Sequence, residues 1–174
     1  VATDTNMEGI KIISSGDTYN DLTISANRSG SANHIGRIVG QWNGGNAASI
    51  VFNTGGDTSS KDDGEILFQT SNGGSSLSTR MVIKQNGKIG INSTSPTYAL
   101  EVDGGTQNTV IVARSSDAKA AISFLDNTTS GYGYATVGGE GDEVYITTGT
   151  GVERLRITST GLIYVNRVGV GGRI

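Results

Sequence analysis

Apolar residues alternate with polar or small residues in short stretches along the chain. Because successive side chains of a strand point to opposite faces, this alternation predicts strands of about four or five residues, each with apolar groups on one face. The alternating pairs are Met81/Ile83, Ile89/Ile91, Leu100/Val102, Ile122/Phe124, Leu155/Ile157, Ile163/Val165 and Val168/Val170.

Two hairpin turns are predicted between these strands. Asn86-Gly87 joins two alternating runs, and a two-residue hairpin turn needs positive φ at both central residues, which Asn and Gly tolerate. Thr160-Gly161 is a weaker form of the same signal nearer the C-terminus. Gly87 and Gly161 are therefore expected to serve turns.

The first of these hairpins is repeated. Thr79–Asn92 recurs as Glu153–Asn166, 74 residues later, with its apolar positions kept and its polar positions varied. Arg80 falls on Arg154 in this alignment. A repeat of this length points to an elongated modular architecture rather than a single catalytic globule.

The repeated unit extends upstream of the hairpin. Glu65–Thr70 resembles Glu143–Thr148, and Ala48–Phe52 resembles Ala120–Phe124. The connections between these segments differ in length, as surface loops on a fixed scaffold do.

The repeat predicts three segments. Residues 1–21 form a lead-in segment, residues 22–104 the first β repeat, and residues 105–174 the second. The first repeat is expected to carry a loop insertion at residues 30–45, which contains the only Trp and the only His of the chain.

Composition also predicts an all-β fold. Ile and Val number 30 against 7 Leu, and Gly, Ser, Thr and Asn supply 79 of the 174 residues. β-branched residues suit a pleated surface, whereas Gly, Ser and Asn favour turns and weaken helices. Leu, Ile, Val and Phe together number only 40, so one chain has only a thin apolar stripe to bury.

This shortage of apolar residues predicts that copies of the chain share a core. We expect an elongated homotrimeric fibre with intertwined short strands and β-hairpin repeats, in which three apolar stripes meet along an axis. Such an assembly also protects strand edges from aggregation. A stable monomer would instead favour an ordinary β-sandwich binding module.

Charge and motifs narrow the function. A net charge of −3 and a pI near 5.1 argue against a nucleic-acid partner. The chain has no Cys, and no apolar run approaches the ~20 residues of a membrane helix. No nucleophile elbow, phosphate-binding glycine loop or zinc motif occurs, so no catalytic residue, metal or cofactor is predicted. The opening residue, Val1, predicts a fragment or a processed product.

One family resemblance is carried by the first repeat. The segments Arg80-Met-Val-Ile, Gly87-Lys-Ile-Gly-Ile-Asn, Ser95-Pro96 and Leu100-Glu-Val102 resemble the shaft repeats of bacteriophage tail fibres and related tailspikes. These repeats are often found upstream of a self-cleaving intramolecular chaperone of the endosialidase type. The second copy departs from the pattern, since Tyr164–Gly171 contains no Pro.

The resemblance implies a non-enzymatic role in the virion. The chain would be a segment of a phage tail fibre, mediating or spacing recognition of the host cell surface. Its partners would be its own copies, other tail proteins, and a host polysaccharide or outer-membrane component, with no membrane insertion. Two alternatives remain open: a fibre-borne polysaccharide depolymerase, and a purely structural shaft.

Aromatic residues are the candidate receptor contacts. Trp42 and Asn43 lie in a Gly-rich stretch, where an aromatic ring packs against a sugar face and an amide bonds its hydroxyls. The alternative for Trp42 is a cap on the end of a trimer core. Tyr132 and Tyr134, flanked by glycines, suit glycan or protein contact or plain packing.

Several charged residues have a functional and a structural interpretation. Arg80 and Arg154 are anion contacts or, as favoured here, partners of acidic groups at the repeat junction. His34 could bind a metal on a threefold axis, but it lacks a second His at short spacing. Ser116-Asp117 resembles a chaperone cleavage dipeptide but lies inside a repeat.

Two acidic groups complete the candidates. The first could ligate calcium or simply be a solvated loop, and its spacing does not match a calcium-binding loop. The second could supply the two carboxylates of a glycosidase, although neighbouring turn positions rarely place carboxylates across a substrate. The groups are Asp57, Asp62, Asp63 and Glu65, and Glu140, Asp142 and Glu143.

Overall fold

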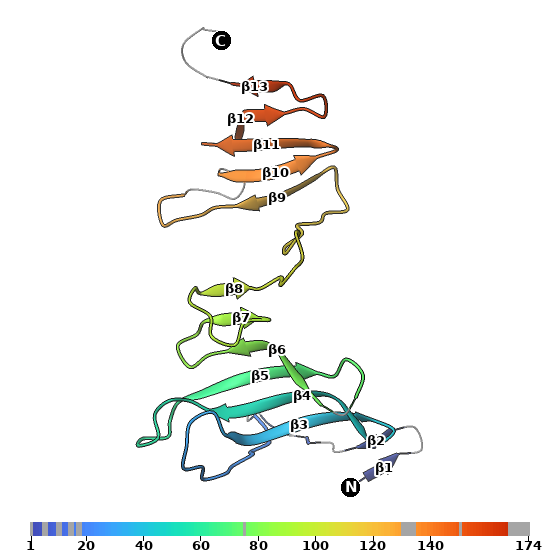
Figure 1. Cartoon of the computed structure of the whole chain (residues 1–174), viewed down its shortest axis with the longest axis vertical. Helices are drawn as coiled ribbons and strands as arrows, with labels where there is room; N and C mark the ends of the chain where they lie inside the picture. Colours follow the sequence, from blue (N-terminus) through green and yellow to red (C-terminus); the bar gives the residue numbers. More distant parts are fainter. Residues whose placement is uncertain are drawn as a thin grey trace. The chain divides into compact units, whose positions relative to one another are not determined.

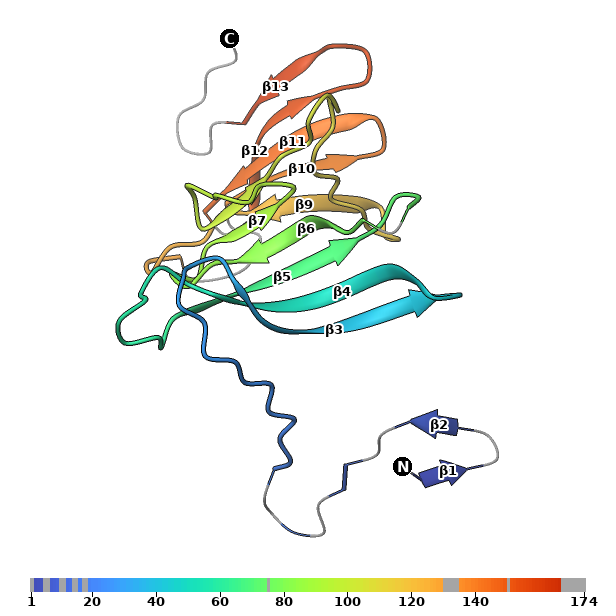
Figure 2. The same cartoon turned by 60° about the horizontal axis from the view of Figure 1, so that its bottom comes forward.

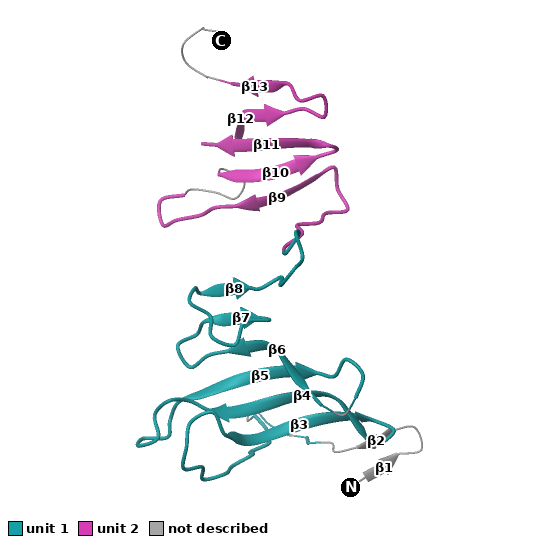
Figure 3. Cartoon of the chain, in the orientation of Figure 1, with its two compact units in different colours: residues 1–110 teal, residues 111–174 magenta. Residues whose placement is uncertain are grey.

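The computed structural model describes residues 2–4, 7–9, 12–13, 16, 19–74, 76–129, 135–149 and 151–166. These residues form strands and loops without a helix, which confirms the predicted all-β class. No helix in this part of the chain is long and apolar enough to cross a membrane. The chain divides into two compact units, residues 1–110 and residues 111–174 (Figure 3).

Unit 1 contains a small strand pair and a six-stranded sheet, here called sheet 1. β1 (Ala2–Asp4) pairs with β2 (Met7–Gly9). Sheet 1 has the order β3-β4-β5-β6-β7-β8, so each strand lies beside the next one in the chain (Figure 1). Neighbours are antiparallel except β7 and β8, which are parallel. The strands are β3 (His34–Trp42), β4 (Gly45–Thr54), β5 (Gly64–Thr70), β6 (Ser78–Ile83), β7 (Ile89–Ile91) and β8 (Leu100–Val102).

Unit 2 contains a five-stranded antiparallel sheet, here called sheet 2. Its order, β9-β10-β11-β12-β13, again follows the chain. Figure 2 shows the strands of sheet 1 side by side in one layer, and Figure 1 shows the same succession in sheet 2. The strands are β9 (Lys119–Ser123), β10 (Thr136–Glu140), β11 (Glu143–Thr148), β12 (Val152–Ile157) and β13 (Ile163–Val165).

The range predicted to be a loop insertion, residues 30–45, instead contains most of a hairpin. β3 occupies His34–Trp42 and pairs with β4 along its length. Its apolar signal is weak because Gly36 and Gly40 occupy alternating positions, so backbone pairing with β4 supplies what the side-chain pattern lacks.

The strand order also corrects the upstream alignment of the repeat. β4 lies directly beside β5, whereas β9 is separated from β11 by β10. Ala48–Phe52 therefore corresponds in position to β10, and Ala120–Phe124 corresponds to β3. β10 was not predicted because Gly138 and Gly139 leave it without an apolar alternation.

The repeated hairpins have the same geometry in both units. Ile83 pairs with Ile89 in sheet 1, and Ile157 with Ile163 in sheet 2. Positive φ occurs at Gly87 and at Gly161, as predicted for these glycines.

The turn type of these hairpins differs from the prediction. The Gly87 amide donates to the Lys84 carbonyl over 2.9 Å, and the Lys84 amide donates to the Lys88 carbonyl over 2.9 Å. Asn86 does not have positive φ. This is a three-residue loop with one left-handed residue at its end rather than a two-residue turn.

A two-residue turn of the predicted kind joins β3 to β4. Trp42 pairs with Gly45, and the residues between them, Asn43 and Gly44, have φ of 48° and 80°. Positive φ at both central residues matches the Asn-Gly turn that suits the twist of paired strands. Asn43-Gly44 is thus a sequence signal for the β3–β4 hairpin, although residues 30–45 were predicted to be a loop insertion.

Candidate functional site

Sheet 1 carries two continuous apolar rows on one face. Paired residues on neighbouring strands share a face, so the registers define these rows directly. Neither row contains a charged residue. The first row is Ile38, Ile50, Phe68, Met81, Ile91 and Val102, and the second is Phe52, Ile66, Ile83, Ile89 and Leu100.

Sheet 2 carries the equivalent rows, again without a charged residue. Its strands β11, β12 and β13 match β5, β6 and β7 in both sequence and register. We call this side of each sheet its apolar face. The rows are Ile122, Val137, Ile146, Leu155 and Val165, and Ala120, Gly139, Val144, Ile157 and Ile163.

Both apolar faces are largely uncovered. Ile38 is 50% exposed, Leu100 57% and Ile163 65%. Aliphatic side chains of this size are ordinarily buried in a stable fold, and each contributes roughly 1.5–3 kcal/mol when it is. The described part of the chain realises only part of this contribution, because even central residues of the rows such as Phe68 and Ile146 are only partly buried.

One side chain from the segment that precedes β3 touches the apolar face of sheet 1. A Cβ built on Gly36 would lie 2.0 Å from Cγ2 of Ile24, so Ile24 occupies the space above this glycine. Gly36 pairs with Phe52, which places Ile24 at the end of the second row. The face therefore accepts a β-branched side chain from outside the sheet.

The opposite face of sheet 1 is closed. Val51 and Val82 are almost fully buried there. At the β7–β8 end the connecting loop folds over Gly90, where an added Cβ would lie 2.0 Å from the Ser93 carbonyl oxygen. Glu101 holds this loop by accepting hydrogen bonds from the Ser93 hydroxyl and from the Thr97 amide. The Ser93 hydroxyl is the main reason why the pKa of Glu101 lies below its ordinary value.

The opposite face of sheet 2 holds a charge cluster instead. Arg156, at the position of Val82 in the repeat, contacts Glu140 at 2.8 Å, Glu143 at 2.5 Å and Glu153 at 2.6 Å. The Lys119 ammonium lies 3.1 Å from Glu140. These contacts join β9, β10, β11 and β12 on one side of the sheet.

Hydrogen bonds dominate the electrostatics of this cluster. Those from Arg156 hold the pKa of Glu140 and of Glu153 below the ordinary value. The hydrogen bonds that Arg156 donates also raise its own pKa, and the bond to Glu153 contributes most, followed by those to Glu140 and Glu143. The ring of Tyr145 lies 5.3 Å from the Lys119 ammonium and 5.9 Å from the Arg156 guanidinium, as cation–π contacts require.

The repeated arginines occupy a β-bulge in each sheet. Phe68 pairs with Met81 and the next residue, Gln69, pairs with Thr79, so Arg80 has no paired residue on β5. In the same way, Arg154 has no paired residue on β11. A bulge redirects the side chain of its extra residue.

Each of these arginines donates to a threonine on the neighbouring strand. Arg80 Nε donates to Thr70 Oγ1 over 3.0 Å, and Arg154 Nε donates to Thr148 Oγ1 over 3.1 Å. Among the described residues no carboxylate forms an ion pair with either. Within one chain, each arginine therefore contacts a threonine hydroxyl where an acidic group was expected.

Trp42 is 85% exposed at the end of β3. It lines a hollow of about 400 Å³ together with Asn46, Ser71 and Gly74. Alternation along β3 also places it on the same face as Ile38, so both sequence interpretations of Trp42 stay open. Asn43 forms the adjoining turn. The other two aromatic candidates, Tyr132 and Tyr134, lie outside the described residues.

The acidic loop candidates are engaged with their own backbone. Asp57 accepts from the amides of Ser59 and Ser60, and Asp63 Oδ2 accepts from the amides of Gly56 and Asp57. The amide of Ser60 is the main cause of the lowered pKa of Asp57.

In the described ranges, no cluster of three His, Asp or Glu side chains has the geometry of a metal site. His34, the candidate for an axial metal, uses its carbonyl to accept from Arg28 Nε over 2.7 Å.

No protein-family model matches the chain, and a comparison with curated proteins gives no match either.

Proposed function

We propose that this chain is a structural and receptor-binding segment of a bacteriophage tail fibre, assembled as a homotrimer. The observation that carries the proposal is the pair of uncovered apolar faces. Each belongs to one copy of a sequence repeat, and neither has a charged residue in its rows.

The chemistry of these faces favours copies of the same chain as the cover. A partner that used charge for recognition would find no complementary group in the rows. Two further copies bring identical apolar rows, and cyclic symmetry lets all three faces be buried at once. Hydrophobic burial of this kind drives most protein association.

The sequence resemblance supplies the biological setting of the proposal. Shaft repeats of tail fibres belong to the virion, where other tail proteins carry them and a host polysaccharide or outer-membrane component is their target. The chain would present its hairpin ends and loops to that target or space the binding part of the fibre from the particle.

A non-enzymatic role agrees with the state of the acidic residues. A glycosidase needs one carboxyl group with a raised pKa to act as general acid. Glu140 instead has a lowered pKa, because Arg156 donates a hydrogen bond to it. Glu143 is bound to the same guanidinium. These carboxylates stabilise the sheet and are poorly suited to proton transfer.

The test of this proposal is the mass of the chain in solution. Light scattering should give about three times the chain mass of 17.9 kDa, and the assembly should resist mild heating because the three faces unfold together. A mass of one chain across the accessible concentration range would overturn the shared core, and with it the fibre assignment.

A further inference from the structure

A polar groove lies at one end of sheet 1, away from Trp42. Two hollows meet there and share Thr54 and Gly55 in their walls. Their volumes are about 230 and 330 Å³. Thr54 ends β4 and Gly45 begins it, so about nine residue steps, roughly 30 Å, separate this groove from the Trp42 turn.

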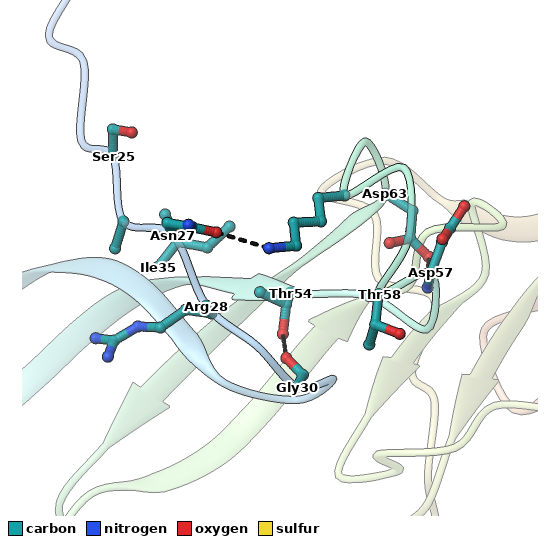
Figure 4. Close-up of a pocket in the computed structure, with 12 residues that line it drawn as sticks. Ser25, Asn27, Arg28, Gly30, Ile35, Thr54, Asp57, Thr58 and Asp63 are labelled. Carbon is teal, nitrogen blue, oxygen red and sulfur yellow. Dashed lines mark hydrogen bonds between the residues drawn. The ribbon is translucent and has the colours of Figure 1, made fainter.

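The first hollow lies between residues 25–30, which precede β3, and the β4–β5 loop (Figure 4). Ser25 and Asn27 stand on one side, with Asp57 and Thr58 on the other. Lys61 spans the gap, since its ammonium donates to Asn27 Oδ1 over 2.7 Å. An ammonium has three donors, so two N–H groups remain for a ligand.

The second hollow lies between the same strand end and the β6–β7 turn. Its polar groups include Ser31, Gln85 and Asn86, together with the ion pair of Lys84 and Glu65. Hydroxyl and amide groups thus line both hollows.

The walls of the groove are fixed before any ligand arrives. Thr54 Oγ1 donates to the Gly30 carbonyl over 2.9 Å and accepts from the Asn33 amide over 2.9 Å. A Cβ on Gly55 would lie 2.3 Å from Gln85 Oε1 and 2.4 Å from the Asp63 carboxylate, so both side chains lie against the backbone at this glycine. A preformed site loses less conformational entropy on binding.

The ionisable groups of the groove balance in charge. The first hollow holds Arg28 and Lys61 against Asp57 and Asp63. The second adds one paired Lys and Glu. This balance gives no attraction for a polyanion, whereas a neutral ligand rich in hydroxyls finds both donors and acceptors along the groove.

From this geometry we infer that the groove binds a neutral saccharide, with one sugar ring in each hollow. Lys61 and Asn27 would bond hydroxyls of the first ring, and Gln85 and Asn86 those of the second. The inference rests on the proposed role in host-surface recognition and places the receptor contact at the opposite end of β4 from Trp42.

Saturation-transfer NMR and calorimetry on the full chain test the inference with four neutral disaccharides: maltose, cellobiose, lactose and N,N′-diacetylchitobiose. We expect at least one to bind and Lys61→Gly to weaken that binding by about tenfold or more, because a charge-assisted hydrogen bond is lost. Lys61 has φ of 57°, so glycine keeps the backbone of the loop. Arg114→Ala, which removes one exposed cation elsewhere, should leave binding unchanged.

Three outcomes would overturn the inference. These are no binding of any of the four sugars at about 10 mM, binding that Lys61→Gly leaves intact, and binding that Trp42→Ala abolishes. Every residue of the groove comes from one chain, so binding is measured independently of assembly. A trimer without sugar binding removes only the groove, and a monomer that binds sugar removes only the fibre assembly.

Discussion

The two sheets are alike on one face and different on the other. Their apolar faces match over β5–β7 and β11–β13, but the opposite face buries Val82 in sheet 1 and places Arg156 among three glutamates in sheet 2. Residues that contact the same partner in both repeats should stay alike, whereas residues that contact only their own sheet are free to differ between the repeats. The constant face is therefore the one that we assign to assembly.

The strongest test of this difference exchanges the two residues. Val82→Arg places a guanidinium in the nearly closed side of sheet 1, where Leu67 and Gly90 are its cross-strand neighbours. Of the three glutamates around Arg156, only Glu143 has an acidic counterpart in sheet 1, Glu65, and Lys84 already forms an ion pair with it. Removal of the charge from water with too few carboxylate partners costs several kcal/mol, so the melting temperature should fall steeply. Circular dichroism would record the melting, with Val82→Leu as the control for size. Melting like that of the unchanged protein would contradict our account of this face.

A second test puts charge into the shared face. Val165→Asp lies in an apolar row of β13, at 58% exposure, and Tyr164→Asp lies beside it on the opposite face, at 57%. Because assembly would bury three aspartates together, Val165→Asp should convert the trimer to monomers, while Tyr164→Asp should leave it intact. Light scattering distinguishes the two. Equal masses for both variants would show that the apolar face is not the contact.

A third comparison uses acid. Glu140 and Glu153 have pKa values in the fold below the ordinary value of 4.5. Such groups stabilise the fold above their unfolded pKa, and this stabilisation is lost as pH falls through the folded pKa. Hydrogen-exchange protection of β10–β12 should therefore fall below about pH 4.5 more than that of β4–β6.

The control for the acid experiment removes the guanidinium. In Arg156→Val the three glutamates repel one another at neutral pH, so their protonation should now increase protection of sheet 2. An unchanged pH dependence would mean that the cluster does not hold the strands together.

The smallest expected effect compares the two turns. Gly87 and Gly161 have φ of 79° and 83°. A Cβ in this left-handed region costs about 1–2 kcal/mol, so Gly87→Ala and Gly161→Ala should each lower stability by a similar amount in chemical denaturation. Gly87→Asn should recover part of the loss, because Asn visits this conformation more easily. Clearly unequal costs would show that the two hairpins are not structurally equivalent.

The sequence predicted the elements with clean alternation and missed the glycine-rich ones. β6 and β7, and β12 and β13, follow from their apolar spacing, but the three-residue loops that join them set a register which a two-residue turn would not give. β3 and β10 form chiefly because a neighbouring strand offers its backbone, which no side-chain period reports.

The candidate sites were less predictable than the strands. Asn43-Gly44 was a readable turn signal, but the Arg156 cluster depends on the register of three strands, and the groove depends on a contact between Asn27 and Lys61, 34 residues apart. Such contacts follow from tertiary pairing, which a single sequence does not contain.

The strand order described above has a kinetic consequence. Every neighbour in both sheets is also the next strand in the chain, so each new pair closes a short loop and adds little loop-closure entropy. A growing chain can therefore extend each sheet strand by strand in the order of synthesis, without waiting for a distant segment. In the proposed trimer, encounter between copies would then be the step whose rate depends on concentration.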